Sequence, residues 1–295
     1  MSKTRRRKPT PSRATGRRKK DLPAPSVSRD KRRKVLVIGA GPSGLVALKT
    51  LRENGYDAVC IESSSEIGGT FASKSYDNGA LVSSKYITAF SDFRWETASD
   101  NHPPIPEYLS YLNEYCEAFN LYDHIYFDVQ VTRLHKHHVG KNAKKNVTVY
   151  SVSCKFMGDQ QAQADIQLLL KTKFDAVAVC SGLHNVPYTP KITGLDHFKG
   201  KIIHSSQYKK RSIFKNKKVL IVGCGETAMD LAYRAVTTSN KQVSLVVRHG
   251  FLSVPTVLTE DIPLDTYITN LFECCYQHKW YVILLVLPTI ARLTS

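Results

Sequence analysis

The sequence lacks the cysteine spacings that zinc ribbons and redox-active dithiols need. Its seven cysteines are scattered, and only Cys274 and Cys275 are adjacent. No C-x-x-C or C-x-x-x-x-C motif occurs, which argues against a zinc site and against a disulfide reductase. An odd number of scattered cysteines favours free thiols in a reducing compartment. A cluster of His135, His137 and His138 lies in a stretch rich in lysine and histidine, and we expect no metal site there.

The sequence also has little that could cross a membrane. A span takes about 20 apolar residues, whereas the apolar stretch 280–291 (WYVILLVLPTIA) is short and interrupted by Pro288. We interpret it as a core or interfacial helix without its packing partners; a membrane-surface contact and a truncated span are alternatives. No secretory signal is recognisable. We therefore expect a cytoplasmic protein.

Acidic and apolar residues are nearly absent from the first 34 residues. This segment holds fifteen Lys and Arg but only two acids, and so carries +13 of the net charge of +17. It cannot bury enough apolar surface to offset its ordering entropy, so we expect a disordered basic tail over 1–33. A solvated extension, a nuclear-localisation or polyanion-binding arm, and a mitochondrial presequence remain open. The rest is nearly neutral, so nucleic-acid binding is not expected outside the tail.

Downstream of the tail the sequence predicts an α/β fold with parallel sheets. Two β–α–β units, 35–62 and 218–247, each combine a continuous apolar strand, a glycine turn, a helix and a second apolar strand. Two such units predict two dinucleotide-binding, Rossmann-like domains. Between them we expect a helix over 105–120, a strand over 125–134, a hairpin formed by 147–156 and 164–170, and a buried strand over 174–180.

The first glycine motif, G-A-G-P-S-G, has the spacing of a dinucleotide site. Gly39 permits the tight turn, Gly41 lets the backbone approach a pyrophosphate, and Gly44 lets helix and strand pack closely. The helix that follows presents unpaired N–H groups and the positive end of its dipole to the phosphates. Glu62, at the end of the next strand, is placed to accept hydrogen bonds from a ribose diol. A merely structural glycine turn is the alternative.

The second glycine motif, G-C-G-E-T-A, is followed by a base where the first is followed by an acid. Gly223, Gly225 and Thr227 form its turn and the helix start, and Arg248 follows the next strand. A guanidinium can bind a 2′-phosphate through two parallel charge-assisted bonds, whereas a carboxylate would repel it. The first site therefore suits FAD, and the second suits NADPH over NADH. The alternative for Arg248 is a solvated loop cation.

A third motif lies between the two units and carries a family resemblance. The run from Phe198 to Tyr208 fits F-x-G-x-x-x-H-x-x-x-Y, and it resembles the signature of the flavin-containing monooxygenases. Baeyer–Villiger relatives usually end this motif in Trp. The resemblance covers about residues 34–260 and implies that His204 couples the two nucleotide sites rather than moving protons. A linker histidine that organises the domain junction is the plainer interpretation.

Other stretches resemble the same family and add residues near FAD. The resemblance implies cofactor-binding positions at Gly69 in a flavin loop, Lys85 in the segment over the flavin, Val131 near the adenine, and Gly182 in a linker strand. Family members often have Asn where this chain has Val82. An apolar side chain cannot hydrogen-bond near the flavin, so Ser83 and Ser84 are the candidates to replace it.

The resemblance implies an FAD- and NADPH-dependent enzyme of the N,N-dimethylaniline monooxygenase type. Such an enzyme uses O₂ to oxygenate a nucleophilic nitrogen or sulfur atom of a small molecule through a C4a-hydroperoxyflavin. It needs neither a protein nucleophile nor a metal. An uncoupled NADPH oxidase-type flavoprotein is one rival, consistent with Val82, and a truncated non-catalytic paralogue is another. The motifs identify neither the substrate nor the oligomeric state.

The resemblance also implies a discontinuous FAD domain, whose last strand returns after the NADPH domain. We expect the FAD-binding domain and its linker over 34–214 and a partial NADPH-binding domain over 215–295. The C-terminal return of the FAD domain is missing from this assignment. We therefore expect an unpaired sheet edge and uncovered apolar surface.

Overall fold

A computed structural model describes residues 33–139, 147–157, 166–167, 169, 171–183, 185–251, 256–257 and 262–267. The chain divides into the units Met1–Arg32 and Arg33–Ser295, and the architecture below is that of the second. The basic tail over 1–33 lies outside the described residues except for Arg33, and the apolar stretch 280–291 lies outside them altogether.

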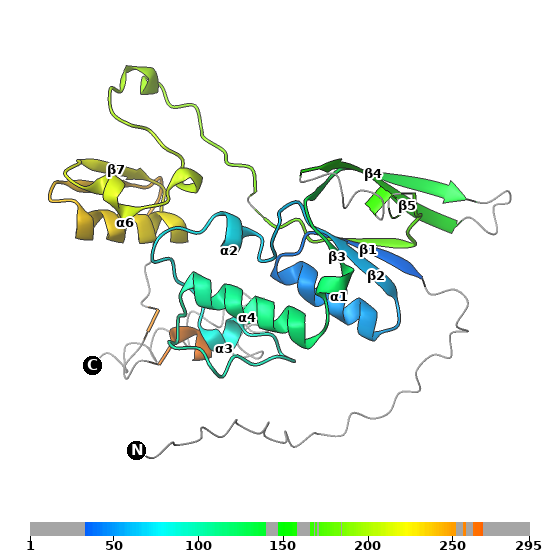
Figure 1. Ribbon diagram of the computed structural model, residues 1–295. Helices are drawn as coiled ribbons and strands as arrows, with labels where there is room; N and C mark the ends of the chain where they lie inside the picture. The colour runs from blue at the N-terminus through cyan, green and yellow to red at the C-terminus, as the bar shows by residue number, and fades with distance from the viewer. Residues whose placement is uncertain are drawn as a thin grey trace, which may run out of the picture. The chain divides into compact units, whose positions relative to one another are not determined.

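The N-terminal part of this fold contains a four-stranded parallel sheet with the order β3-β2-β1-β6. Its strands are β1 (Lys34–Ile38), β2 (Asp57–Ile61), β3 (Ile125–Tyr126) and β6 (Ala176–Val179). The helix α1 (Pro42–Glu53) connects β1 to β2, as Figure 1 shows in blue. The parallel α/β fold predicted from the sequence is therefore confirmed.

The strand β1 is apolar throughout because both of its faces are covered. Val35 and Val37 pack with Leu45 and Leu48 of α1 in one buried cluster. Leu36 points the other way, into a second cluster with side chains from the hairpin described below. Successive side chains of a strand alternate between faces, so a strand buried on both sides needs a continuous apolar run.

An aromatic core surrounds the helix α4 (Ile105–Ala118). Tyr108, Tyr111 and Tyr115 lie on its buried face, as their helical spacing predicts. Trp95 stacks on Tyr111 with ring centroids 4.8 Å apart. Two one-turn helices, α2 (Thr70–Ser73) and α3 (Lys85–Thr88), and the 3₁₀ turn η1 (Tyr122–His124) complete this part of the fold.

An antiparallel hairpin follows, formed by β4 (Val129–Val139) and β5 (Val147–Phe156). The prediction that 147–156 pairs with 164–170 was wrong, because the partner of β5 is the strand before it. Within 164–170 the structure describes Ile166, Gln167 and Leu169, and all three are helical. Ile166 is buried against the hairpin cluster, so its apolar character reflects packing rather than strand formation.

The second β–α–β unit is also present. The parallel strands β7 (Val219–Val222) and β8 (Val243–Val246) flank the helix α6 (Glu226–Thr238). The 3₁₀ turns η3 (Leu195–His197), η4 (Ser205–Gln207) and η5 (Arg211–Phe214) precede this unit, and η7 (Leu264–Tyr267) follows it.

The strand β6 is more exposed than its sequence predicts. We expected a strand buried on both faces, but Ala176 is exposed and Val179 is 64% exposed. Within the described sheet β6 is an edge strand, paired with β1 alone.

Among the described residues, no helix combines the length and apolar character that a membrane crossing requires. Those residues also contain no group of three or more metal-ligating side chains. The described cysteines are free thiols: Cys60, Cys116, Cys154, Cys180 and Cys224.

Candidate functional site

Two of the three glycines in the first motif are required by the fold itself. Gly39 has a φ of +101°, and a Cβ there would lie 2.6 Å from the carbonyl oxygen of Cys180. A Cβ on Gly44 would lie 1.8 Å from the carbonyl oxygen of Gly39. Any side chain at either position would force the turn or the start of α1 to move.

The middle glycine is different, because nothing in the fold demands it. Gly41 is the N-cap of α1, with φ of −73° and ψ of 178°, which any residue adopts. The nearest atom to a Cβ there is the Cα of Gly69, at 3.8 Å. Gly69 has a φ of +57° and faces Gly41 in return, with the Cα of Gly41 3.3 Å from its own Cβ position. Two residues without side chains thus border the space in front of the helix.

Glu62 connects the end of β2 to this turn. Its buried carboxylate accepts a hydrogen bond from the backbone N–H of Ala40 at 2.6 Å. The other oxygen accepts from the Ser64 hydroxyl at 2.6 Å, the Ser64 N–H at 2.9 Å and the Ser63 hydroxyl at 3.1 Å. Burial pushes the pKa of Glu62 upward, but these hydrogen bonds together outweigh it and the pKa is lowered. Glu62 is therefore held as a carboxylate at the mouth of the turn.

The second glycine turn repeats the geometry of the first in an open setting. Gly223 has a φ of +117°, so its backbone requires glycine, whereas Gly225 has an ordinary φ of −74° as the N-cap of α6. Among the described residues, no heavy atom apart from the adjoining backbone lies within 4 Å of a Cβ on either residue. Thr227 lies in the first turn of α6.

Arg248 lies two residues beyond the end of β8 and is exposed. Within the described ranges no carboxylate forms an ion pair with it. No acid stands at the position where the first β–α–β unit has Glu62.

The two serine candidates, which directly precede α3, have different surroundings. Ser84 is fully buried, its N–H donates to Asp265 Oδ2 at 2.7 Å, and its hydroxyl finds no hydrogen-bond partner among the described residues. The hydroxyl of Ser83 pairs with that of Thr88 at 2.8 Å, on an exposed surface. Val82 is 53% exposed.

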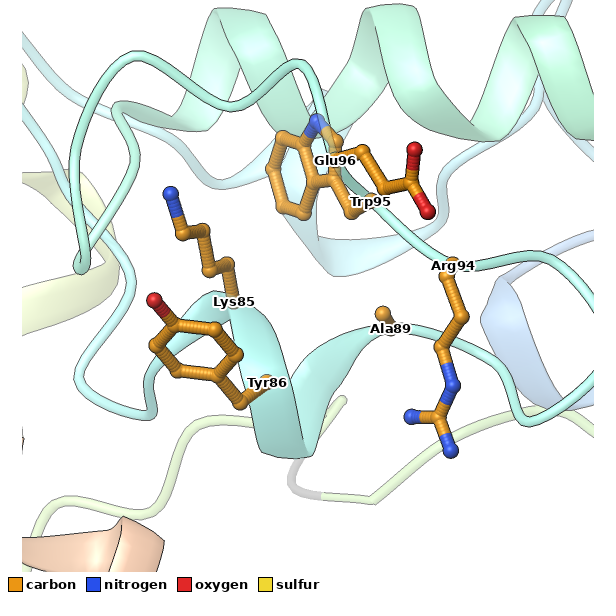
Figure 2. Close-up of a pocket in the computed structure, with 6 residues that line it drawn as sticks. All are labelled: Lys85, Tyr86, Ala89, Arg94, Trp95 and Glu96. Carbon is orange, nitrogen blue, oxygen red and sulfur yellow. The ribbon is translucent and has the colours of Figure 1, made fainter. Parts of the chain in front are cut away.

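Lys85 lies between two cavities. The first, of about 440 Å³, is lined by Lys85, Tyr86, Ala89, Arg94, Trp95 and Glu96. Figure 2 shows Lys85 and Tyr86 on one side of it and Arg94 on the other. The ammonium of Lys85 donates to the carbonyl of Ala98 at 3.2 Å and lies 5.5 Å from the ring centroid of Tyr86.

The second cavity, of about 420 Å³, shares Lys85 and is lined on another side by His102. Both ring nitrogens of His102 are buried, and neither has a hydrogen-bond partner in the part of the chain that the structure describes. An imidazole without a partner is costly to bury. The volume of each cavity is within the range that small-molecule ligands occupy.

His204 acts locally as a helix cap. Its Nδ1 accepts a hydrogen bond from the N–H of Ser206 at 3.2 Å, and its own N–H donates to Gln207 Oε1 at 3.0 Å. The motif ends at Tyr208, which is 1% exposed and stacks on Phe214. The described contacts of His204 thus organise the linker, and none of them reaches a glycine turn.

The two remaining candidates lie on separate elements. Gly182, with a φ of +80°, follows β6 and faces the side chain of Asn185. Val131 lies in β4 at a register shift of the hairpin and packs on the second core cluster.

Two polar clusters near these elements were missed by the sequence analysis. On α1, the buried Lys49 binds Asp92 at 2.5 Å and Glu53 at 2.6 Å, and these bonds raise its pKa, that to Asp92 most of all. The i,i+4 spacing of Lys49 and Glu53 is visible in the sequence, but the contact with Asp92 is not. The other cluster joins Tyr76 to Asp230 and Arg234 of α6.

The fold and the two glycine turns define an α/β protein built on two β–α–β units of the dinucleotide-binding type. The model of one family, described as flavin-binding monooxygenase-like, matches residues 32–283. The chain belongs to this flavin-binding monooxygenase-like family.

Individual relatives agree with this assignment. Monooxygenase ptmN of Penicillium ochrochloron is 39% identical over 269 residues, which cover 83% of this chain and 42% of that protein. Flavin-containing monooxygenase 3 of Oryctolagus cuniculus is 30% identical over 269 residues, covering 85% of this chain and 48% of that protein. The chain therefore spans less than half the length of these curated relatives.

A solved structure shows the same fold. The OTEMO complex with FAD and NADP is similar with a TM-score of 0.54 and 23% identity, over 72% of this chain and 38% of that one.

Proposed function

We propose that this chain forms the nucleotide-binding part of an FAD- and NADPH-dependent monooxygenase. The observation that carries the proposal is the contrast among the glycines. Gly39, Gly44 and Gly223 are required by backbone conformation or packing, whereas Gly41 and Gly225 are not. A glycine that the fold does not need, in front of a helix N-terminus, suits the close approach of a pyrophosphate.

The charges that follow the two turns support the assignment of FAD to the first turn and NADPH to the second. Glu62 is held ionised and can accept hydrogen bonds from the ribose of FAD at the first turn. Arg248, which forms no ion pair with a described carboxylate, would bind the 2′-phosphate of NADPH at the second. We accordingly assign FAD binding to 34–214 and NADPH binding to 215–295, and we assign Gly69, Lys85, Val131 and Gly182 to the FAD side and Thr227 to the NADPH side.

The bound FAD would supply the redox chemistry, taking a hydride from NADPH and passing electrons to O₂. The chain's own residues bind and orient: the turns hold the phosphates, and the cavities at Lys85 offer a space of small-molecule size. The substrate we propose is a small molecule with a nucleophilic nitrogen or sulfur atom, as the family resemblance implies. No protein nucleophile is assigned.

The test is an absorption spectrum of the purified chain followed by product analysis. We expect a flavin spectrum, NADPH-dependent bleaching in the absence of O₂, and an oxygenated product when O₂ is admitted. Peroxide without oxygenated product would instead support an NADPH oxidase, a rival favoured by the exposed, apolar Val82 in place of a hydrogen-bonding side chain. A chain that binds neither FAD nor NADPH would be non-catalytic, and the proposal would fail.

A further inference from the structure

A polar cluster, which we call the Arg234 junction, joins Tyr76, Asp77 and Asn78 to Asp230 and Arg234. The guanidinium of Arg234 binds in three directions: to Asp230 Oδ2 at 2.8 Å, to the carbonyl of Asp77 at 3.0 Å and to the carbonyl of Asn78 at 2.7 Å. The same Asp230 oxygen accepts the Tyr76 hydroxyl at 2.5 Å. The guanidinium lies 5.0 Å from the Tyr76 ring centroid, and the Arg234 side chain is only 13% exposed.

The loop 73–78 is held from a second side by the segment that ends the third motif. The Lys209 ammonium donates to the carbonyls of Ser73 and Ser75, and the Asp77 N–H donates to the Lys209 carbonyl at 2.9 Å. Tyr76 meets the buried Tyr208 edge to face at 5.2 Å. Tyr208 in turn packs in one cluster with Leu231 and Ala235 of α6. Polar bonds and apolar packing therefore fix the same loop.

The two sides of the junction each belong to a proposed nucleotide site. The loop 73–78 follows directly on Gly69 and α2, which border the first glycine turn. Asp230 and Arg234 lie on α6, whose N-cap is Gly225 of the second turn. A helix is a stiff element, so holding Arg234 also fixes the position of that N-terminus.

We propose that Asp230 and Arg234 are positioning residues for hydride transfer. They hold α6 against the loop that follows the FAD turn, so that a nicotinamide bound at α6 and a flavin bound at the first turn meet in reacting geometry. This inference rests on the proposed function. Arginine suits the position because its planar fork satisfies a carboxylate and two carbonyls at once, which a lysine ammonium cannot do in this geometry.

The kinetic test compares Arg234→Met and Arg234→Lys with the wild-type chain, at saturating FAD and NADPH. The matched control is Tyr233→Ala, which alters a neighbouring side chain on α6 that is 70% exposed. We expect Arg234→Met to slow anaerobic flavin reduction by about tenfold or more, since a displacement near 1 Å costs up to about a hundredfold. The dissociation constants of FAD and NADPH should change less than about twofold. Arg234→Lys should recover part of the rate, and Tyr233→Ala should match the wild type.

An unchanged reduction rate in Arg234→Met would overturn the proposal. So would a slower rate that returns to the wild-type value when the NADPH concentration is raised further, because weaker NADPH binding alone would be the effect of a structural residue of the second site.

Hydrogen exchange provides a readout that does not depend on activity. In Arg234→Met the amides of 76–79 and 208–211 should exchange faster, while those of α1 stay protected; Tyr233→Ala should change neither. If the wild type binds both nucleotides but does not reduce flavin, the proposed function fails. The exchange data would still test whether Arg234 holds the loop 73–78. Unchanged exchange over 76–79 in Arg234→Met would show that Arg234 does not hold this loop.

Discussion

Replacement of Glu62 by Gln tests the carboxylate that ties the first turn to β2. One oxygen of Glu62 accepts from Ala40 N–H and the other from Ser64 and Ser63. A glutamine amide keeps one acceptor oxygen and places an NH₂ donor at the other position. If the oxygen stays with Ser64, the Ala40 N–H faces a donor and is left unpaired in a buried site. We expect the free energy of unfolding to fall by about 1–3 kcal/mol, the cost of one such group.

The same substitution has a predictable dependence on pH. The pKa of Glu62 is lowered in the folded chain, because its hydrogen bonds outweigh the opposing effect of burial. A group with a lowered folded-state pKa stabilises the fold above its unfolded-state pKa, and this contribution is lost as the pH falls through the folded-state value. The wild type should lose it on acidification, while Glu62→Gln has none to lose. The difference between the two proteins should therefore be largest near neutral pH and shrink in acid.

Urea denaturation followed by circular dichroism measures this difference at several pH values. Glu66→Gln is the matched control, because Glu66 is an exposed neighbour that should change neither stability nor its pH dependence. A parallel FAD titration should show weaker binding in Glu62→Gln, since an amide cannot accept both hydrogen bonds of a ribose diol. Equal stability of Glu62→Gln and wild type at neutral pH would refute the reasoning, as would a difference that persists unchanged into acid.

Three further predictions concern the glycine turns and the tail. Gly41→Val should abolish FAD binding yet leave the FAD-free chain as stable as before, since the backbone there suits any residue. Equilibrium dialysis with FAD measures the binding, and Gly225→Val is the control that should bind FAD normally. Stoichiometric flavin in Gly41→Val would show that the first motif is a structural turn. Arg248→Ala should weaken NADPH binding by about 1.5–3 kcal/mol, the strength of one charge-assisted bond, and NADH binding far less; calorimetric titration that finds equal losses would contradict the assignment. Deletion of residues 1–30 should leave flavin content and thermal midpoint unchanged, because the tail has almost no apolar residues to pack; a lower midpoint would show that it packs on the fold.

The sequence predicted the two β–α–β units well because each carries strong local signals. Val35 to Ile38 form a strand covered on both faces, and Gly39 and Gly44 are glycines that the turn cannot do without. The helix over 105–120 was found for the same reason, since its tyrosines recur at helical spacing and are buried. Periodicity and glycine turns are properties of neighbouring residues, and a sequence displays them directly.

The hairpin was predicted with the wrong partner because a short apolar run does not reveal its own conformation. The run 164–170 is compatible with a strand or with a buried helical turn, and Ile166 is helical. The strand β5 pairs backward with β4 instead. In the candidate site, the hydrogen bond from Tyr76 to Asp230 joins residues 154 positions apart, and no local sequence pattern predicts such a contact.

That long span also determines when the junction can form. Closing a flexible loop costs free energy that rises only with the logarithm of its length, about 0.6 kcal/mol for each doubling. Contacts distant in sequence nevertheless form late, and synthesis delivers the N-terminal part first. We therefore expect the sheet around β1 to fold before α6 has been synthesised. Until α6 docks, water would hydrate the Tyr76 hydroxyl and the carbonyls of Asp77 and Asn78. Docking of the second β–α–β unit would then be a separate, final step, and a substitution at Arg234 should slow this step while both units still fold.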